Sequence, residues 1–223
     1  MRGSPTVLRA GVPSALSAGE LHLWWWGHSE GHPQERRGRV DRCLRQALRH
    51  YTRTADEPLD FGREAKGRPF LRNRGAPDFN LSDTSGGTML AITSQGRVGV
   101  DLERADRSLP ALRLARRWFS PEEAAALSAR PEKARAAEFI RLWTAKEASC
   151  KATGTGIFGH LDRWRFELAE GEPVAIQPLP TEAGHADDWQ FVRISPAEGF
   201  TAVLALWGVG FTGLRLIAAD PPI

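Results

Sequence analysis

Hydrophobic positions recur along the chain with two periods, and each period predicts a different element. Short apolar or alternating runs are typical of strands, and apolar stripes at helical spacing are typical of helices. Strands and helices occur in both halves without regular alternation, so we expect an α+β fold with a mostly antiparallel sheet. The predicted strands are residues 21–26, 79–82, 88–94, 97–102, 164–168, 189–194, 200–207 and 213–217. The predicted helices are residues 33–51, 108–118 and 132–152, and one that begins at the capping-box sequence Ser120-Pro121-Glu122-Glu123.

One short connection is specific enough to predict a strand pairing. Gln95-Gly96 joins the predicted strands 88–94 and 97–102, and a short link with glycine between two such runs is typical of a hairpin. Residues 52–77 carry repeated Pro and Gly instead. We expect a loop there, with a short extended piece at 69–71.

Composition limits the class of protein. Hydrophobic residues make up 41% of the 223 residues and charged residues 26%, which is typical of a globular protein with a core. No apolar run is long enough to span a bilayer, and the N-terminal segment lacks the apolar stretch of a signal peptide. Cys43 and Cys150 are too few for a disulfide scaffold. We therefore expect a cytoplasmic protein with no membrane partner.

The charge pattern argues against a nucleic-acid partner. The formal net charge is +3, and most of the basic residues are Arg. Guanidinium groups match phosphate oxygens in geometry, which favours a phosphate-bearing partner, although a high-GC genome would also enrich Arg. Nucleic-acid binding usually needs a clustered basic surface, and this charge is scattered.

The sequence Gly-Val-Asp-Leu-Glu places two acids on one face of a predicted strand. Strand side chains alternate between faces, so Asp101 and Glu103 lie together, and Val98, Val100 and Leu102 form the core face. Neighbouring carboxylates repel each other unless water or a cation lies between them. Mg²⁺ typically takes one or two carboxylates together with phosphate oxygens. The pair fits a metal–phosphate site, and an exposed strand edge with two solvated acids is the alternative.

A second candidate group lies on the predicted helix 132–152. Trp143, Glu147 and Lys151 are spaced four residues apart and share one stripe of the helix. A Glu that faces a metal and a Lys that faces a phosphate would use this geometry. A buried Trp beside a surface Glu–Lys ion pair would use it equally well.

Several short motifs occur in an order that closely resembles the Sfp-type 4′-phosphopantetheinyl transferases. They are Gly67-Arg68-Pro69, Phe-Asn-Leu-Ser at 79–82, Gly-Val-Asp-Leu-Glu at 99–103, the segment 118–123 and the segment 142–157. The resemblance implies two similar α+β halves related by a pseudo-twofold axis, with the active site in the cleft between them. It also implies transfer of the 4′-phosphopantetheine arm of coenzyme A to a serine of an apo acyl or peptidyl carrier protein, with Mg²⁺ and release of 3′,5′-ADP.

The same resemblance sets expectations for domains and partners. We expect the halves to be residues 1–104 and 105–223, and the protein to be a monomer. The carrier protein would belong to a fatty-acid, polyketide or non-ribosomal peptide synthase. Carrier helices are usually acidic, so the basic residues beside Trp118 are candidates to face one, although they also fit an ordinary solvated helix face. These residues are Arg113, Arg116 and Arg117.

The resemblance also assigns roles to the acids and the lysine. Asp101, Glu103 and Glu147 correspond to the Mg²⁺-binding acids of the family. Glu147 further corresponds to the proposed general base toward the carrier serine, and Lys151 to the lysine that contacts the phosphates and assists the leaving group. Lys146 matches the Lys-Glu motif but points away from the stripe, so we expect a structural role for it.

Coenzyme A contacts are implied for Arg68, Lys151 and, more loosely, Arg45. Asp83 departs from the family pattern, because a His that contacts the 3′-phosphate of coenzyme A usually stands at this position. A carboxylate there would repel the phosphate. Three outcomes are open: Arg68, Arg45 and Ser82 or Thr84 hold the phosphate; Asp83 turns away or anchors an Arg; or donor affinity is reduced. This departure also leaves an alternative function, a non-catalytic module of the same fold that binds coenzyme A or a carrier protein.

Overall fold

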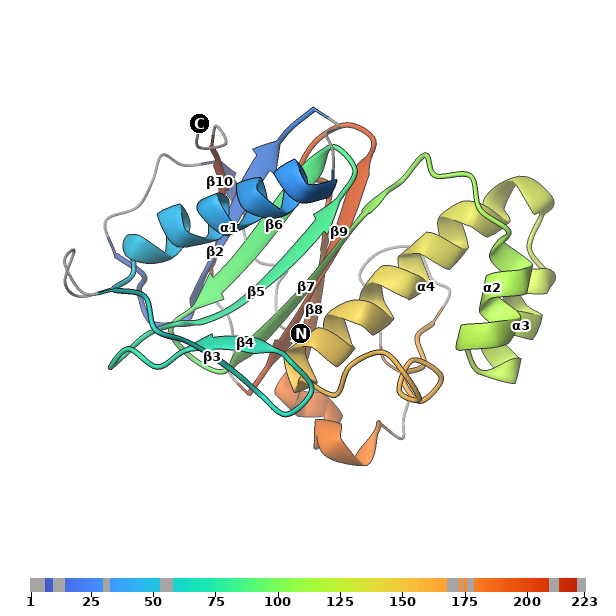
Figure 1. Cartoon of the computed structure of the whole chain (residues 1–223). Coiled ribbons are helices and arrows are strands. Elements are labelled where there is room, and N and C mark those ends of the chain that lie inside the picture. Colours follow the sequence, from blue (N-terminus) through green and yellow to red (C-terminus); the bar gives the residue numbers. More distant parts are fainter. Residues whose placement is uncertain are drawn as a thin grey trace.

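Two β-sheets, a short β-ribbon and four α-helices make up the described part of the computed structural model (Figure 1). That part comprises residues 7–9, 15–29, 33–52, 58–167, 173, 175, 179–208 and 213–219. The larger sheet has the strand order β1 (Val7–Arg9), β10 (Gly213–Ala218), β2 (Glu20–Gly27), β6 (Gly87–Thr93) and β5 (Asp78–Thr84).

The smaller sheet has three strands. Their order is β7 (Arg97–Arg104), β9 (Phe200–Trp207) and β8 (Trp189–Ile194), and the separate ribbon consists of β3 (Phe61–Arg63) and β4 (Pro69–Leu71). Strand β10 pairs in parallel with β1 and β2, and every other strand pairing among the described residues is antiparallel. The predicted α+β class with mostly antiparallel sheet is therefore confirmed.

The helices cover different sheets. Helix α1 (Pro33–Arg49) crosses one face of the larger sheet, and α4 (Glu132–Thr153) lies along β7 and β9 of the smaller sheet (Figure 1). Helices α2 (Ala111–Trp118) and α3 (Pro121–Ser128) pack beside α4, and two 3₁₀ turns follow at Thr181–Ala183 and Ala186–Asp188. None of the helices in the described ranges is long and apolar enough to cross a membrane.

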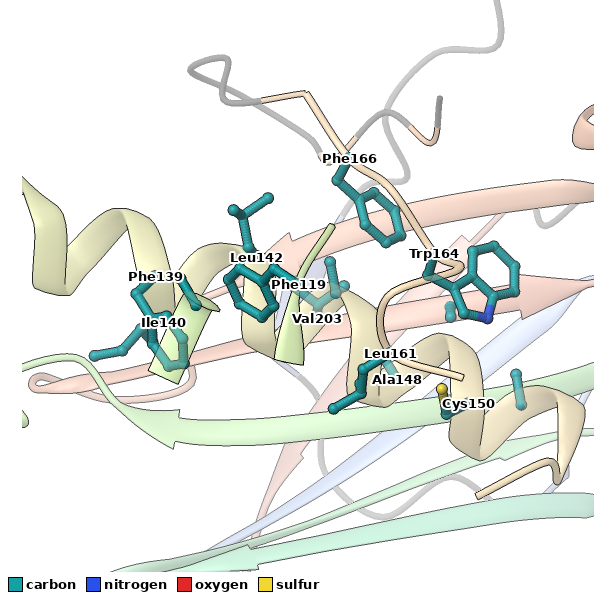
Figure 2. Close-up of a cluster of buried hydrophobic side chains, with 14 of the residues drawn as sticks. Phe119, Phe139, Ile140, Leu142, Ala148, Cys150, Leu161, Trp164, Phe166 and Val203 are labelled. Atoms are coloured by element: carbon teal, nitrogen blue, oxygen red, sulfur yellow. The ribbon is translucent and has the colours of Figure 1, made fainter. Parts of the chain in front are cut away.

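Three buried clusters hold these layers together. Leu23 of β2, Met89 of β6 and Val100 of β7 belong to the cluster between the two sheets. Trp24 and Trp26 point to the opposite face of the larger sheet and pack beneath α1. The third cluster joins α2 and α4 to β9 and to the segment after α4. It includes Phe139 of α4, Trp164 of the following segment and Val203 of β9 (Figure 2). Alternate residues of strand β2 thus pack into different clusters on the two faces of the larger sheet.

The predicted hairpin between residues 88–94 and 97–102 is wrong. Both strands form, but β6 pairs with β2 on one side and with β5 on the other, so neither edge is left for β7. Strand β7 pairs with β9 instead, from a distant part of the sequence. The Gln95-Gly96 turn therefore carries the chain from one sheet to the other.

Two smaller expectations also differ from the structure. The predicted loop 52–77 contains the β3–β4 ribbon, whose first strand was not predicted. Residues 164–168 were predicted as a strand, but the described part forms only an isolated bridge between Phe166 and Ala175. Leu168 lies outside the described residues.

Strand pairings join residues on the two sides of the predicted division at residue 104. Strand β7 precedes the division but pairs with β9, which follows it. Strand β10 follows the division but pairs with β2, which precedes it. The sheets are thus assembled from both segments, and the division into residues 1–104 and 105–223 stays a prediction.

Candidate active site

Helix α4 approaches β7 closely because the strand carries a glycine at the contact. A Cβ atom at Gly99 would lie 1.9 Å from the carbonyl oxygen of Ala148 and 2.6 Å from the backbone nitrogen of Ala152. Since side chains alternate along the strand, Gly99 shares its face with Asp101 and Glu103. The helix therefore covers the strand face that carries the two acids.

Charged side chains meet where α4 crosses this face. The Nζ atom of Lys151 lies 2.7 Å from Asp101 Oδ1 and 3.9 Å from Glu147 Oε2. Glu103 lies near enough to Asp101 and Glu147 for their charges to interact, and its carboxylate accepts a hydrogen bond from Arg107 at 3.3 Å. The structure thus brings together the three acids and the lysine that the sequence singled out.

Burial and like charges make this cluster electrostatically unusual. Burial, followed by the carboxylate of Asp101, raises the pKa of Glu147 to about 7. The same two causes raise the pKa of Glu103 above its usual value. Burial alone would lower the pKa of Lys151, but the carboxylates of Asp101 and Glu147 raise it above its usual value. The lysine therefore stays charged and partly compensates the acids.

The cluster fits a divalent cation by its chemistry. No three His, Cys, Asp or Glu side chains in the described ranges are grouped closely enough to hold a metal ion. However, carboxylate oxygens are the donors that Mg²⁺ prefers, and Asp101 Oδ2 is buried with no hydrogen-bond partner among the described residues. A cation would also relieve the repulsion that raises the pKa values of Glu103 and Glu147. These acids therefore suit Mg²⁺, with Lys151 as the positive charge among them in this structure.

A cavity of about 260 Å³ opens beside this cluster. Its wall includes the predicted motif Gly67-Arg68-Pro69, the two lysines Lys66 and Lys151, and Gly154, which ends α4 with a φ of +75°. Positive charge in a cavity suits phosphate groups. The cavity and the acid cluster share Lys151, so a phosphate-bearing ligand in the cavity would lie next to the acids.

Arg68 lines this cavity but is held by protein groups. Its guanidinium donates two hydrogen bonds to Asp78, at 2.9 and 2.7 Å, and one each to the carbonyl oxygens of Lys151 at 2.9 Å and Val98 at 3.0 Å. It is 7% exposed. Arg68 thus links the ribbon, β5, β7 and α4, and the nucleotide contact implied by the resemblance stays a prediction. Nothing in the sequence indicated Asp78 as its partner.

Asp83 contacts the N-terminal part of α1. Its carboxylate accepts hydrogen bonds from Arg36 and from the hydroxyl of Thr88, the latter at 2.6 Å. His28 lies 3.4 Å from the same carboxylate, and its ring Nδ1 lies 3.2 Å from Arg39. Asp83 thus anchors an arginine, which was one of the outcomes left open. No local sequence pattern indicated these contacts, because Arg36 meets Asp83 through the packing of α1 on the sheet, and His28 follows β2, which is separated from β5 by β6 in the same sheet.

The other predicted basic residues lie on helix surfaces. Arg45 pairs with Asp41 at 2.8 Å and lies over the ring of Phe61 of the ribbon. The basic residues beside Trp118 are exposed, and one of them, Arg117, lies over the Trp118 ring at 5.0 Å. The role of Arg45 toward coenzyme A and that of the basic residues beside Trp118 toward a carrier protein stay predictions.

Lys146 precedes Glu147 on α4, points away from the acid cluster and is fully buried. Its Nζ donates to Glu123 Oε2 at 2.7 Å and to the carbonyl oxygens of Leu161 and Trp164. Glu123 completes the capping box of α3 with Ser120, as predicted. Lys146 therefore joins α3, α4 and the segment after α4, which is the structural role expected for it.

Comparison with known proteins identifies the family. Residues 97–204 match the family model described as the 4′-phosphopantetheinyl transferase superfamily. The chain is 31% identical over 171 residues to the 4′-phosphopantetheinyl transferase HetI of Nostoc sp., and the match covers 75% of this chain and 69% of HetI. The chain belongs to the 4′-phosphopantetheinyl transferase superfamily. The predicted family and enzyme class are thereby confirmed.

Other phosphopantetheinyl transferases match shorter parts. The enzyme psf-1 of Bacillus pumilus is 34% identical over 127 residues, which cover 57% of this chain and 53% of psf-1. The enzyme Sfp of Bacillus subtilis strain 168 is 26% identical over 137 residues, which cover 61% of this chain and 60% of Sfp. The matched region therefore covers little more than half the length of each of these two relatives. The family model includes β7 and α4, which carry the acid cluster.

Proposed function

We propose that this phosphopantetheinyl transferase moves the 4′-phosphopantetheine arm of coenzyme A to a serine of an acyl or peptidyl carrier protein and releases 3′,5′-ADP. The observation that carries the proposal is the convergence of Asp101 and Glu147 on Lys151, at the edge of a cavity with basic walls. A pyrophosphate in this cavity would meet the lysine and the acids together. Such transfer depends mainly on positioning and charge compensation.

The roles of the chain's own residues follow from their places. The serine oxygen of the carrier protein would attack the phosphorus that bears the pantetheine group, and the bond from that phosphorus to the oxygen of the leaving 3′,5′-ADP would break. Glu147 would accept the serine proton, the role that the family resemblance assigns to it. Lys151 would offset the charge that develops on the leaving phosphate.

A Mg²⁺ ion belongs to this proposal. The family resemblance assigns Asp101, Glu103 and Glu147 to hold it. Because these side chains are not grouped closely enough for a metal ion here, the two glutamates would have to move toward Asp101, whose buried Oδ2 has no hydrogen-bond partner among the described residues. When bound, Mg²⁺ would neutralise part of the pyrophosphate charge and help to orient it.

The contacts of Asp83 favour a catalytic protein over the alternative of a non-catalytic module. That alternative depended on a carboxylate that would repel the 3′-phosphate of coenzyme A. The carboxylate of Asp83 is instead compensated by Arg36, with His28 beside it. We propose that these basic groups, rather than a histidine at position 83, offset the phosphate charge in this chain.

The carrier protein itself is proposed only by class. The exposed basic residues beside Trp118 would complement an acidic carrier helix. A carrier of fatty-acid, polyketide or peptide synthesis, the cytoplasmic location and the monomeric state all stay predictions from the sequence.

A mass-shift assay tests the proposal. Purified protein, coenzyme A and Mg²⁺ should increase the mass of an apo carrier protein by one phosphopantetheine group, and a chelator should abolish the increase. Asp101→Ala and Glu147→Gln should reduce the rate about 100-fold or more. Glu132→Gln, at the exposed first turn of the same helix, is the matched control and should keep the rate. Unchanged carrier mass across a broad panel of apo carriers would argue against the function.

A further inference from the structure

Strands β5 and β7 meet at the edges of two different sheets, and their contact is made through side chains. The backbone N–H groups of Val98, Val100 and Leu102 on β7 donate to side-chain oxygens on β5. The three acceptors are Asp78 Oδ2 at 2.8 Å, Asn80 Oδ1 at 2.9 Å and Ser82 Oγ at 3.1 Å. We call this row of three acceptors the polar seam.

The polar seam follows from the period of the two strands. Residues 78, 80 and 82 point to one face of β5, and alternate N–H groups of β7 point away from its partner β9. Those N–H groups are buried at a sheet edge, where an unpaired donor would destabilise the fold. Short polar side chains at alternate positions satisfy them without a backbone ladder.

Ser82 differs from Asn80, the adjacent acceptor in the polar seam, because it also contacts the acid cluster. Its Oγ accepts from Leu102 N at 3.1 Å and from Lys151 Nζ at 3.0 Å, and it donates its own proton to Asp101 Oδ1 at 3.0 Å. A hydroxyl has one donor and two acceptor lone pairs. Its bonding capacity is therefore complete within the protein.

These bonds divide the two oxygens of Asp101 between different tasks. Oδ1 accepts from both Ser82 and Lys151, the latter at 2.7 Å. Oδ2 is buried and has no hydrogen-bond partner among the described residues. The carboxylate is thus fixed by one oxygen and open at the other.

We propose that Ser82 is a positioning residue that fixes Asp101 so that Oδ2 is presented to a divalent cation. The inference rests on the proposed function of the acid cluster. This role is distinct from the phosphate contact for which Ser82 was one candidate, and that contact stays a prediction. Partners of metal-binding side chains typically change metal affinity by 10- to 100-fold when they are removed.

The experiment compares two variants that each remove one bond of the polar seam. Ser82→Ala leaves Leu102 N without its acceptor, and Asn80→Ala leaves Val100 N without its acceptor, but only Ser82 touches Asp101 and Lys151. Binding of Mn²⁺ to the full chain is measured by electron paramagnetic resonance, and thermal unfolding is measured in parallel. We expect both variants to melt at lower temperature. We expect only Ser82→Ala to weaken Mn²⁺ binding, by about 10- to 100-fold.

Kinetics with coenzyme A and an apo carrier protein add a second readout. Ser82→Ala should lower kcat and leave the KM for coenzyme A nearly unchanged, because all the hydrogen bonds that the hydroxyl can make are already used within the protein. The conservative variant Ser82→Thr keeps the hydroxyl and should recover most of the Mn²⁺ affinity.

Three results would overturn the inference. One is Mn²⁺ binding by Ser82→Ala equal to that of the wild type. Another is equal weakening by Asn80→Ala, which would show that the seam as a whole matters and not Ser82. The last is a raised KM for coenzyme A with unchanged Mn²⁺ binding, which would make Ser82 a coenzyme contact. If the wild type binds Mn²⁺ but modifies no carrier, the proposed reaction fails while the comparison of Ser82 with Asn80 still decides this inference.

Discussion

The Nζ atom of Lys151 lies 2.7 Å from Oδ1 of Asp101 and joins helix α4 to strand β7 across a separation of 50 residues. The contact compensates one buried carboxylate and leaves two neighbouring glutamates with raised pKa values. A lysine in this position has two effects on ligands. It attracts phosphate, and it competes with any cation for the same acids.

Replacing this lysine should separate the two effects. Lys151→Met removes a positive charge from the acids, so Mn²⁺ should bind several-fold more tightly. The same change removes the charge that offsets the leaving phosphate, so transfer to the carrier protein should fall by about 100-fold or more. Titration with Mn²⁺ and the mass-shift assay measure the two effects. Weaker Mn²⁺ binding in the variant would contradict this account.

Gly99→Ala should separate the two elements that carry the site. The added Cβ would lie 1.9 Å from a backbone oxygen of α4, and backbone cannot move aside as a flexible side chain can. We expect a loss of about 1–3 kcal/mol in the free energy of unfolding, measured with urea, and a large loss of transfer activity. Gly27→Ala is the control, because a Cβ atom there would lie an ordinary 3.9 Å from Trp25 Nε1. Equal stability of the two variants would count against the close approach.

The buried Lys146–Glu123 pair should be sensitive to removal of one partner. Lys146→Met leaves Glu123 as an uncompensated buried charge, which typically costs about 3–5 kcal/mol. The double variant Lys146→Met/Glu123→Gln should recover part of this loss, because the neutral amide removes the charge. Lys133→Met, at an exposed position of the same helix, should change the free energy of unfolding little. If Lys146→Met unfolds at the same urea concentration as the wild type, the pair does not stabilise the fold.

Asp83 should support the binding of coenzyme A indirectly. Asp83→Ala releases Arg36 from its anchor, so its hydrogen bonds to the coenzyme should weaken and the KM for coenzyme A should rise about 10-fold. If the carboxylate instead repelled the coenzyme, its removal would lower the KM. Asp60→Ala, which frees the exposed Arg72 of the ribbon region, is the control and should have no effect. Steady-state kinetics at saturating carrier protein distinguish the two directions.

His22 should make the stability of the fold depend on pH. Burial is the main cause that lowers the pKa of His22 below its usual 6.5. Below pH 6.5, His22 therefore binds a proton in the unfolded chain but not in the folded chain. The free energy of unfolding then falls by up to about 1.4 kcal/mol for each unit by which the pH is lowered. The loss continues until the pH reaches the lowered pKa of the folded state. Urea unfolding at pH 7.5 and 5.5 measures it.

Two variants show whether this pH dependence comes from His22. His22→Gln cannot titrate, so its stability should fall less between the two pH values than that of the wild type. His185→Gln, at an exposed position, should keep the wild-type difference. An unchanged difference in His22→Gln would assign the pH dependence to other groups.

The sequence by itself determined the local elements and the composition of the acid cluster. The capping box at Ser120 and Glu123 formed as predicted because its hydrogen bonds join residues three apart. Asp101 and Glu103 share a face, and Val100 faces the core, because strand side chains alternate. Such features depend on neighbours along the chain, which the sequence states directly.

The tertiary structure decided which distant groups meet. Gln95-Gly96 is a good hairpin turn, yet β6 and β7 do not pair, because β2 and β5 already occupy both edges of β6. The Ser82 hydroxyl meets Asp101 and Leu102 because β5 and β7 pack side by side, and no local pattern indicated these contacts. Asp83 meets Arg36 only because α1 packs on the larger sheet. The free energy of such contacts depends on the packing of whole layers. A local pattern of residues therefore does not show which of several possible partners a strand or side chain will meet.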